Sequence, residues 1–123
     1  MEKIIIIILM HTIGDHVFQW ASLSVKKRSE ISYLFLHTFI YSVFLAIFSF
    51  AFLDFQNVNN ALLFIIINAV LHFGVDFITG KIKKKLWDSQ AETSYIIAVS
   101  LDQIIHLTIL FTTFFYISKQ SLF

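Results

Sequence analysis

Four long apolar segments dominate this sequence, and each contains polar residues that a helix facing only lipid would not carry. The segments span about residues 4–20, 31–53, 61–79 and 95–117. At a rise of ~1.5 Å per residue, their lengths lie near or above what is needed to cross a hydrocarbon core of ~30 Å. The sequence therefore predicts a bundle of four transmembrane helices.

The amino-acid composition agrees with a helical membrane protein. Hydrophobic residues make up 58% of the chain and charged residues only 14%, whereas about a quarter of the residues in an average soluble protein are charged. The chain has no proline and only three glycines, so it offers few of the turn signals that an all-β fold needs. We expect an all-α fold with a single transmembrane domain over residues 1–123. A soluble four-helix bundle would need a polar outer face, which these segments lack.

Basic residues are concentrated in two of the three connections between the segments. The first connection holds three Lys and Arg residues (Lys26, Lys27 and Arg28), the second holds none, and the third holds four, so the first and third together hold seven of the nine. The positive-inside rule places these connections in the cytoplasm and both termini on the non-cytoplasmic side. Four aromatic residues fall near the predicted cytoplasmic ends of the segments, as in an interfacial belt: Trp20, Tyr33, Trp87 and Tyr95.

Polar residues within the segments recur at intervals of four. The intervals are His11–Asp15–Gln19, His37–Tyr41, Asn68–His72–Asp76 and Asp102–His106. Residues four apart lie on the same face of a helix, so each segment is predicted to carry one polar stripe. An aspartate in the middle of a membrane helix costs ~2.5–3.5 kcal/mol. We therefore expect the stripes to face one another or a cavity.

Counting inward from the estimated cytoplasmic ends places these residues in two layers. The outer layer, roughly 6–10 Å deep, consists of Asp15, His37, Asp76 and Asp102. The inner layer, roughly 12–17 Å deep, consists of His11, Tyr41, His72 and His106. Each layer draws one residue from every segment, which predicts a shared site.

The residue types in these layers indicate a divalent metal site, with zinc as the candidate ion. The chain has no cysteine, so imidazoles and carboxylates must supply the ligands. His11, His72 and His106 provide three imidazoles, a sufficient set for a zinc ion with an open fourth position. Asp76 and Asp102 could complete the coordination.

The remaining residues of the two layers have catalytic roles in this interpretation. Asp15 or His37 could act as the general base towards a metal-bound water, and Tyr41 could donate to a developing oxyanion. Three alternatives remain open for the aspartates and histidines. The aspartates could orient the histidine ligands, the carboxylate layer could hold a second metal, or the whole set could be interhelical hydrogen-bond glue.

Residues outside these layers have simpler interpretations. Lys81, Lys83, Lys84 and Lys85 are predicted to contact anionic lipid headgroups beside the membrane. His16 is rotated ~100° from Asp15 on a helix and has no partner four residues away, so it is left out of the site. The net charge of +1 is too small to indicate nucleic-acid binding.

The polar pattern resembles a bacterial and phage membrane-protein family called domain of unknown function 3307. The resemblance rests on residues in all four segments: His11, Gly14, Asp15, Gln19, His37, His72, Asp76, Lys81, Asp102, Gln103 and His106. It implies a small multi-pass protein of the bacterial inner membrane, but it brings no assigned activity. His16 departs from the pattern, because the family is usually aromatic at this position.

Three classes of function are compatible with the sequence. The favoured hypothesis is a metal-dependent hydrolase that acts on a lipid or another membrane-embedded substrate from the cytoplasmic side. A proton or cation conduit, which would be a homo-oligomer, is the second, although the outer halves of the segments beyond Asn68 are almost wholly apolar. The third is an accessory subunit in which a metal or polar network fixes the helices, with residues 83–92 as its cytoplasmic contact.

Overall fold

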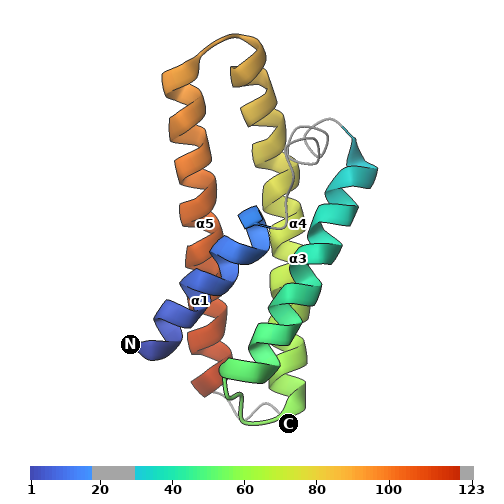
Figure 1. Ribbon diagram of the computed structural model, residues 1–123, viewed down its shortest axis with the longest axis vertical. Coiled ribbons are helices and arrows are strands. Elements are labelled where there is room, and N and C mark those ends of the chain that lie inside the picture. Colours follow the sequence, from blue (N-terminus) through green and yellow to red (C-terminus); the bar gives the residue numbers. More distant parts are fainter. Residues whose placement is uncertain (18–29, 120–123) are drawn as a thin grey trace.

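The computed structural model describes residues 1–17 and 30–119, and every regular element in these two ranges is a helix. α1 (Glu2–Thr12) runs directly into a π-helical turn, η1 (Ile13–Val17). The longer helices are α3 (Ile31–Phe52), α4 (Val58–Asp88) and α5 (Glu92–Lys119). Figure 1 shows the four helices packed as a bundle, with α1 crossing the others obliquely. The predicted all-α fold is confirmed.

Some predicted features lie outside the described residues. These are Gln19, Trp20 and the basic residues Lys26, Lys27 and Arg28. The described part of the first predicted segment is the continuous helix formed by α1 and η1, with 11 and 5 residues respectively. The four-span prediction therefore rests on the sequence for its first segment.

Three helices in the described part of the chain are long and apolar enough to cross a membrane: α3, α4 and α5. At ~1.5 Å per residue, the 22 residues of α3 extend for ~33 Å. The 31 residues of α4 and the 28 residues of α5 extend for ~46 Å and ~42 Å. The last two helices are thus longer than a hydrocarbon core of ~30 Å.

α4 is longer than the apolar pattern predicted, at both of its ends. At its start the Asn57 side chain accepts a hydrogen bond of 2.8 Å from the Asn60 amide, which caps the helix. At its end the helix continues through a buried Gly80 and the lysine-rich stretch as far as Asp88, because lysine is a good helix former. The connection to α5 is consequently only residues 89–91, with Gln90 at a φ of 58°.

The distribution of side chains is inverted relative to a soluble bundle. Large apolar residues on the outer faces of the long helices are exposed, including Phe39 at 68%, Ile66 at 59% and Ile104 at 58%. The buried residues include many polar ones: His11, Asp15, His37, Asn68, His72, Asp76, Lys83, Asp102 and His106. Such an extensive apolar surface is compatible with a membrane protein.

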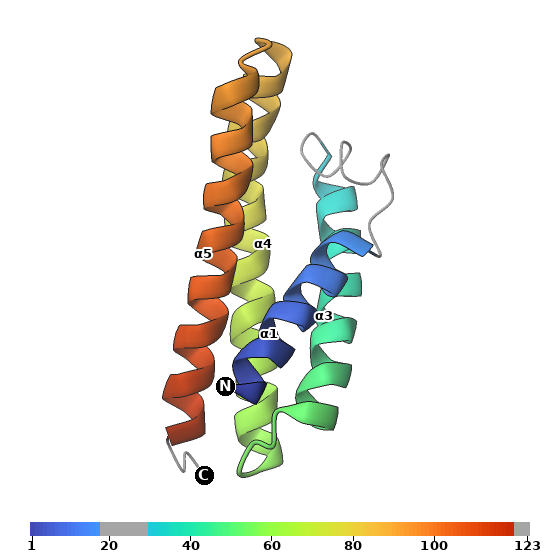
Figure 2. The ribbon, with the colours of Figure 1, turned by 60° about the vertical axis from the view of Figure 1, so that its left-hand side comes forward.

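The interior is divided between an apolar end and a polar end. The apolar core gathers Ile7, Leu45, Phe64, Leu110 and Phe114, at the end of the bundle where α1 and α4 begin and α3 and α5 finish. The polar residues lie farther towards the α4–α5 turn. Figure 2 shows that the α4–α5 hairpin reaches well beyond the first turn of α3.

Candidate metal centre

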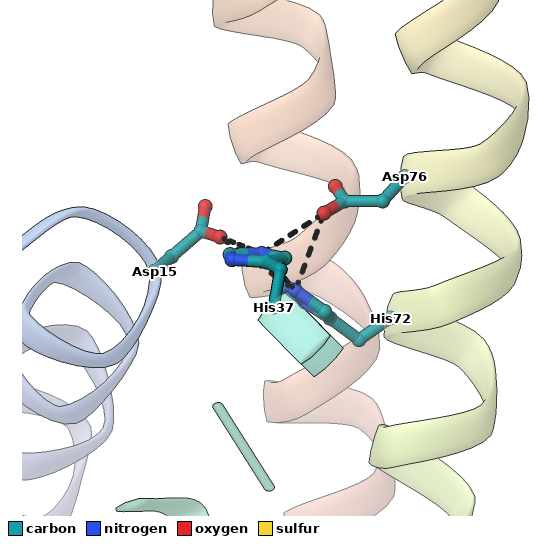
Figure 3. A group of neighbouring side chains, drawn as sticks. All are labelled: Asp15, His37, His72 and Asp76. Atoms are coloured by element: carbon teal, nitrogen blue, oxygen red, sulfur yellow. Dashed lines mark hydrogen bonds and ion pairs between the residues drawn. The ribbon is translucent and has the colours of Figure 1, made fainter. Parts of the chain in front are cut away.

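Asp15, His37, His72 and Asp76 bring four potential metal ligands together inside the bundle. Asp15 comes from η1, His37 from α3, and His72 and Asp76 from adjacent turns of α4. Figure 3 shows the two carboxylates reaching the two imidazoles from opposite sides. We call these four residues the His–Asp cluster. Each has a total exposed fraction of 4% or less.

The two imidazoles of the His–Asp cluster approach each other and both carboxylates through the same nitrogen. His37 Nε2 lies 3.1 Å from His72 Nε2, 3.0 Å from Asp15 Oδ1 and 3.1 Å from Asp76 Oδ2. His72 Nε2 lies 3.6 Å from the same Asp15 oxygen and 3.5 Å from the same Asp76 oxygen. One proton on His37 Nε2 cannot serve three acceptors at once. Four potential ligand atoms thus lie within one small region.

These separations match those between the ligands of a tetrahedral ion. Zinc bonds to nitrogen and oxygen of about 2.0–2.1 Å imply ligand-to-ligand distances of about 3.3–3.4 Å in a regular tetrahedron. Five of the six distances between the ligand atoms of the His–Asp cluster run from 3.0 to 3.6 Å, and all four atoms lie within 4.8 Å of one another. A divalent ion between the four atoms would need little movement of the side chains.

The position of Asp15 depends on the π-helical turn and on a glycine. A π turn inserts one extra residue into a helix and is frequent at functional sites. Gly14 lies so close to α3 that an added Cβ would stand 3.1 Å from Phe44 Cδ1 and 3.2 Å from Tyr41 Cδ2. The absence of a side chain at Gly14 lets η1 approach α3, and this places Asp15 next to His37.

His11 lies near the His–Asp cluster but belongs to a neighbouring hydrogen-bond network. Its Nε2 donates to Gln103 Oε1 at 2.9 Å, because an amide oxygen can only accept. Its Nδ1 is then the acceptor for the Tyr41 hydroxyl at 3.3 Å. The rings of the three expected imidazole ligands, His11, His72 and His106, lie near one another, with centroids 4.4–6.5 Å apart, but within the described residues they are not a group whose ligand atoms converge on one point. His11 supports Gln103 and Tyr41, while His37 takes the place beside His72.

Tyr41 and Gln103 orient members of the His–Asp cluster. The Tyr41 ring stacks on the His72 ring with centroids 3.8 Å apart and an interplanar angle of 7°. Gln103 Nε2 donates to Asp15 Oδ2 at 3.1 Å, which leaves Asp15 Oδ1 directed at the imidazoles. Tyr41 was expected to stabilise an oxyanion, but its hydroxyl is engaged with His11 and its side chain is buried.

Asp102 forms a second polar centre, next to the His–Asp cluster. Lys83 Nζ donates to Asp102 Oδ2 at 3.0 Å, and Gln103 Nε2 donates to the same oxygen at 3.2 Å. The Thr79 hydroxyl donates to Asp102 Oδ1 at 2.6 Å. Lys83 was predicted to contact lipid headgroups with its neighbours, yet it is only 5% exposed. It faces inwards because it continues the stripe of His72 and Asp76 along α4.

His106 connects Asp102 to the His–Asp cluster. Its Nδ1 donates to the Asp102 backbone carbonyl at 2.9 Å, and its Nε2 lies 3.4 Å from Asp76 Oδ1. Asp76, Asp102 and His106 also offer ligand atoms close enough together to hold a metal ion. Asp76 thus belongs to both groups, with Oδ2 in the first and Oδ1 beside His106.

The sequence identified most of these residues but missed Thr79, Lys83 and Gln103 as partners of the aspartates. Thr79 and Lys83 lie three and seven residues after Asp76, and this spacing places them on the same helix face. That spacing was a usable signal for Lys83, although its place in a basic run favoured the surface. His16, which the sequence does not place in the site, is about half exposed, with an exposed side-chain fraction of 48%. Its Nδ1 donates to the Thr12 carbonyl.

A comparison with known protein families gives a match that covers nearly the whole chain. Residues 4–122 match the family described as "Protein of unknown function (DUF3307)". This confirms the resemblance drawn from the polar residues of the four segments. No curated protein and no solved structure matches the chain.

Proposed function

The chain belongs to the DUF3307 family, and we propose that it is a membrane protein that binds one divalent metal ion at Asp15, His37, His72 and Asp76. Zinc fits this ligand set best, because two imidazoles and two carboxylates at tetrahedral spacing suit its coordination preferences. The single observation that carries the proposal is the convergence of four ligand atoms within 4.8 Å of one another, with both carboxylates 3.0–3.6 Å from the two imidazole nitrogens.

The charges buried in the two polar centres support one divalent ion. Asp15, Asp76 and Asp102 contribute three negative charges when ionised, and Lys83 contributes one positive charge. Inside a bundle surrounded by hydrocarbon, the remaining two negative charges are costly unless they are neutralised. One divalent ion among neutral histidines balances them. The competing explanation is that two protons neutralise these charges. The His–Asp cluster would then be a hydrogen-bonded network without a metal ion.

The geometry favours an ion that holds the helices together over an ion that performs catalysis. Structural zinc sites use four protein ligands, whereas catalytic sites keep a position open for water. The four ligands here join η1, α3 and α4 and are buried. A cavity beside His72, also lined by Tyr41, Asn68 and His106 among others, measures about 10 Å³ and suits about one water molecule rather than a lipid.

That small cavity could hold the hydrogen-bond partner of the second ring nitrogen of His72, Nδ1. Within the described residues His72 Nδ1 and Asn68 Oδ1 have no hydrogen-bond partner, and both residues line the cavity. A water molecule there could accept from His72 Nδ1 and donate to Asn68 Oδ1. A metal-bound histidine usually donates its other ring N–H to an acceptor, which fixes the orientation of the ring.

We place the protein in the bacterial inner membrane with the α4–α5 turn in the cytoplasm. Lys81, Lys84 and Lys85 are exposed near this turn, and Lys81 Nζ lies 4.1 Å from the centre of the Phe77 ring. Cations at the end of a membrane helix, above an aromatic side chain, suit contact with anionic headgroups. In this placement the first predicted segment forms a fourth span, and both termini face away from the cytoplasm.

Metal analysis of the purified protein tests the proposed function. Wild-type protein in detergent, loaded with zinc and dialysed, should retain one ion per chain by mass spectrometry of the metal. His72→Ala and Asp76→Asn should lose it. His16→Ala is the matched control, because it removes an exposed histidine beside the same site and should keep the ion. Absence of stoichiometric metal from the wild type would exclude the proposal.

Cobalt substitution separates a closed site from a hydrolytic one. Tetrahedral Co²⁺ absorbs strongly in the visible region, and exogenous azide changes this spectrum when it can replace a bound water. We expect a tetrahedral spectrum that azide leaves unchanged. An azide-dependent change would favour the metal-dependent hydrolase, in which a water molecule replaces Asp15 or His37 as a metal ligand.

A further inference from the structure

We propose that Asp76, Asp102 and His106 form a second cation position, and that the ammonium group of Lys83 supplies its charge in place of a second metal ion. This inference rests on the proposed function of the His–Asp cluster. It makes Lys83 the residue that limits the protein to one divalent ion. Three features support the second position: the two carboxylate oxygens of Asp76, the tautomer of His106 and the burial of Lys83.

Asp76 has the geometry of a carboxylate that bridges two cations. Its Oδ2 lies 3.1 Å from His37 Nε2, within the His–Asp cluster. Its Oδ1 lies 3.4 Å from His106 Nε2, on the other side. Bundles that hold two metal ions use carboxylates and histidines from facing helices, and α4 and α5 face each other here (Figure 1).

The tautomer of His106 leaves a lone pair directed at the second position. Its Nδ1 must carry the proton, because it donates to the Asp102 carbonyl oxygen at 2.9 Å. In a neutral ring Nε2 is then an acceptor, and in the part of the chain that the structure describes it has no hydrogen-bond partner. His106 is only 3% exposed. A buried imidazole lone pair beside a carboxylate oxygen is an arrangement that a cation stabilises.

Lys83 provides the positive charge on the far side of Asp102. Its Nζ is 3.0 Å from Asp102 Oδ2, and its side chain is only 6% exposed. The other two donors to Asp102, Thr79 and Gln103, are neutral. Lys83 therefore supplies to Asp102 the charge that a second metal ion would otherwise supply. Lysine can do so in a membrane protein because its flexible stem reaches from the helix to the carboxylate.

Removing the lysine charge should open the second position to a metal ion. Without Lys83 the three aspartates carry three negative charges, of which one divalent ion balances two. A second divalent ion together with one hydroxide restores neutrality; the hydroxide comes from a water molecule whose proton is released to the solvent. We expect the bound metal to rise from one to two ions per chain.

The test compares the metal content of Lys83→Gln with that of the wild type. Glutamine keeps a hydrogen-bond donor for Asp102 and removes the charge. Lys84→Gln, at an exposed position on the same helix, is the control and should keep one ion. Lys83→Arg retains the charge and should also keep one ion. Lys83→Met serves as a second neutral variant if Lys83→Gln does not fold.

A double variant checks that charge is the cause. Lys83→Gln combined with Asp102→Asn removes one charge of each sign, so one ion should again be bound. One ion in both neutral Lys83 variants, with one ion in the wild type, would overturn this inference and leave the proposed function intact. No ion in the wild type would overturn the proposed function, and this inference would fail with it.

Discussion

The Nε2 atoms of His37 and His72 lie 3.1 Å apart although the residues belong to different helices, α3 and α4. At this distance the two nitrogens share a proton or coordinate a common cation, because two unprotonated lone pairs would repel each other. The carboxylates of Asp15 and Asp76 approach the same two atoms. A cation common to all four groups has measurable consequences for stability, for backbone substitutions and for neighbouring residues.

Removal of the proposed metal ion should destabilise the protein. An ion that binds only the folded state at a concentration 100-fold above its dissociation constant adds about 2.7 kcal/mol to the free energy of unfolding. We expect a chelator to lower the thermal unfolding temperature of the wild type, measured by circular dichroism in detergent. The Asp15→Asn/Asp76→Asn double variant should not respond to the chelator. An equal response of both proteins would contradict a role for these carboxylates.

Gly14→Ala should weaken metal binding without touching a ligand. The new Cβ would stand 3.1 Å from Phe44 and 3.2 Å from Tyr41, so η1 must move away from α3 and carry Asp15 with it. We expect the affinity for zinc, measured by competition with a chelating dye, to fall by roughly tenfold, the lower end of the range for disturbed support of a metal ligand.

The matched control for this substitution is Gly74→Ala. An added Cβ at Gly74 meets no atom within 4 Å, and alanine stabilises a helix interior by about 1 kcal/mol relative to glycine. Zinc affinity should therefore be unchanged and stability equal or higher. Equal loss of affinity in both variants would show that the effect is not specific to the approach of η1 to α3.

Gln103→Leu should reduce metal affinity because it removes the amide that orients Asp15. Gln103 donates to Asp15 and accepts from His11, and loss of such supporting hydrogen bonds typically costs 10–100-fold in affinity. The same dye competition measures the change. Gln56→Leu, a substitution at the opposite end of the bundle where Gln56 donates to Ser118, should leave the affinity unaltered.

Single cysteines can test the proposed orientation in the membrane, because the chain contains no cysteine. A membrane-impermeant thiol reagent should label Ser89→Cys, in the α4–α5 turn, only in inverted membrane vesicles. It should label Gln56→Cys, in the α3–α4 turn, only in right-side-out spheroplasts. The reverse pattern would place the basic α4–α5 turn outside and would contradict the positive-inside prediction.

The sequence predicted the class of fold and the members of the site better than it predicted their partners. Intervals of four residues identified His37, His72, Asp76, Asp102 and His106 as inward-facing, and all five are buried. Periodicity gives the face of a helix on which a residue lies. It does not give the rotation or offset of one helix against another, which decides whether His11 or His37 stands beside His72.

Local deviations from regular helix geometry also could not be predicted from the sequence. The π turn of η1 shifts Asp15 relative to an ideal helix, and no periodic pattern signals such a turn. Helix ends were misplaced around Gly80, since glycine and a lysine run normally mark the end of a membrane helix. The helix continues past Gly80 because Lys83 is buried in the interior, where it forms an ion pair with Asp102.

The order of the ligands along the chain has a consequence for biogenesis. Asp15 lies near the N-terminus, whereas His72 and Asp76 lie in the second half of the chain and Gln103, which orients Asp15, lies later still. During synthesis the carboxylate of Asp15 can therefore contact His72 only after α4 has been made. Its hydrogen bond from Gln103 can form only after α5 has been made. Under the proposed function, full metal affinity is reached only after α5 has been added, so that retention of the ion would report a completely assembled protein.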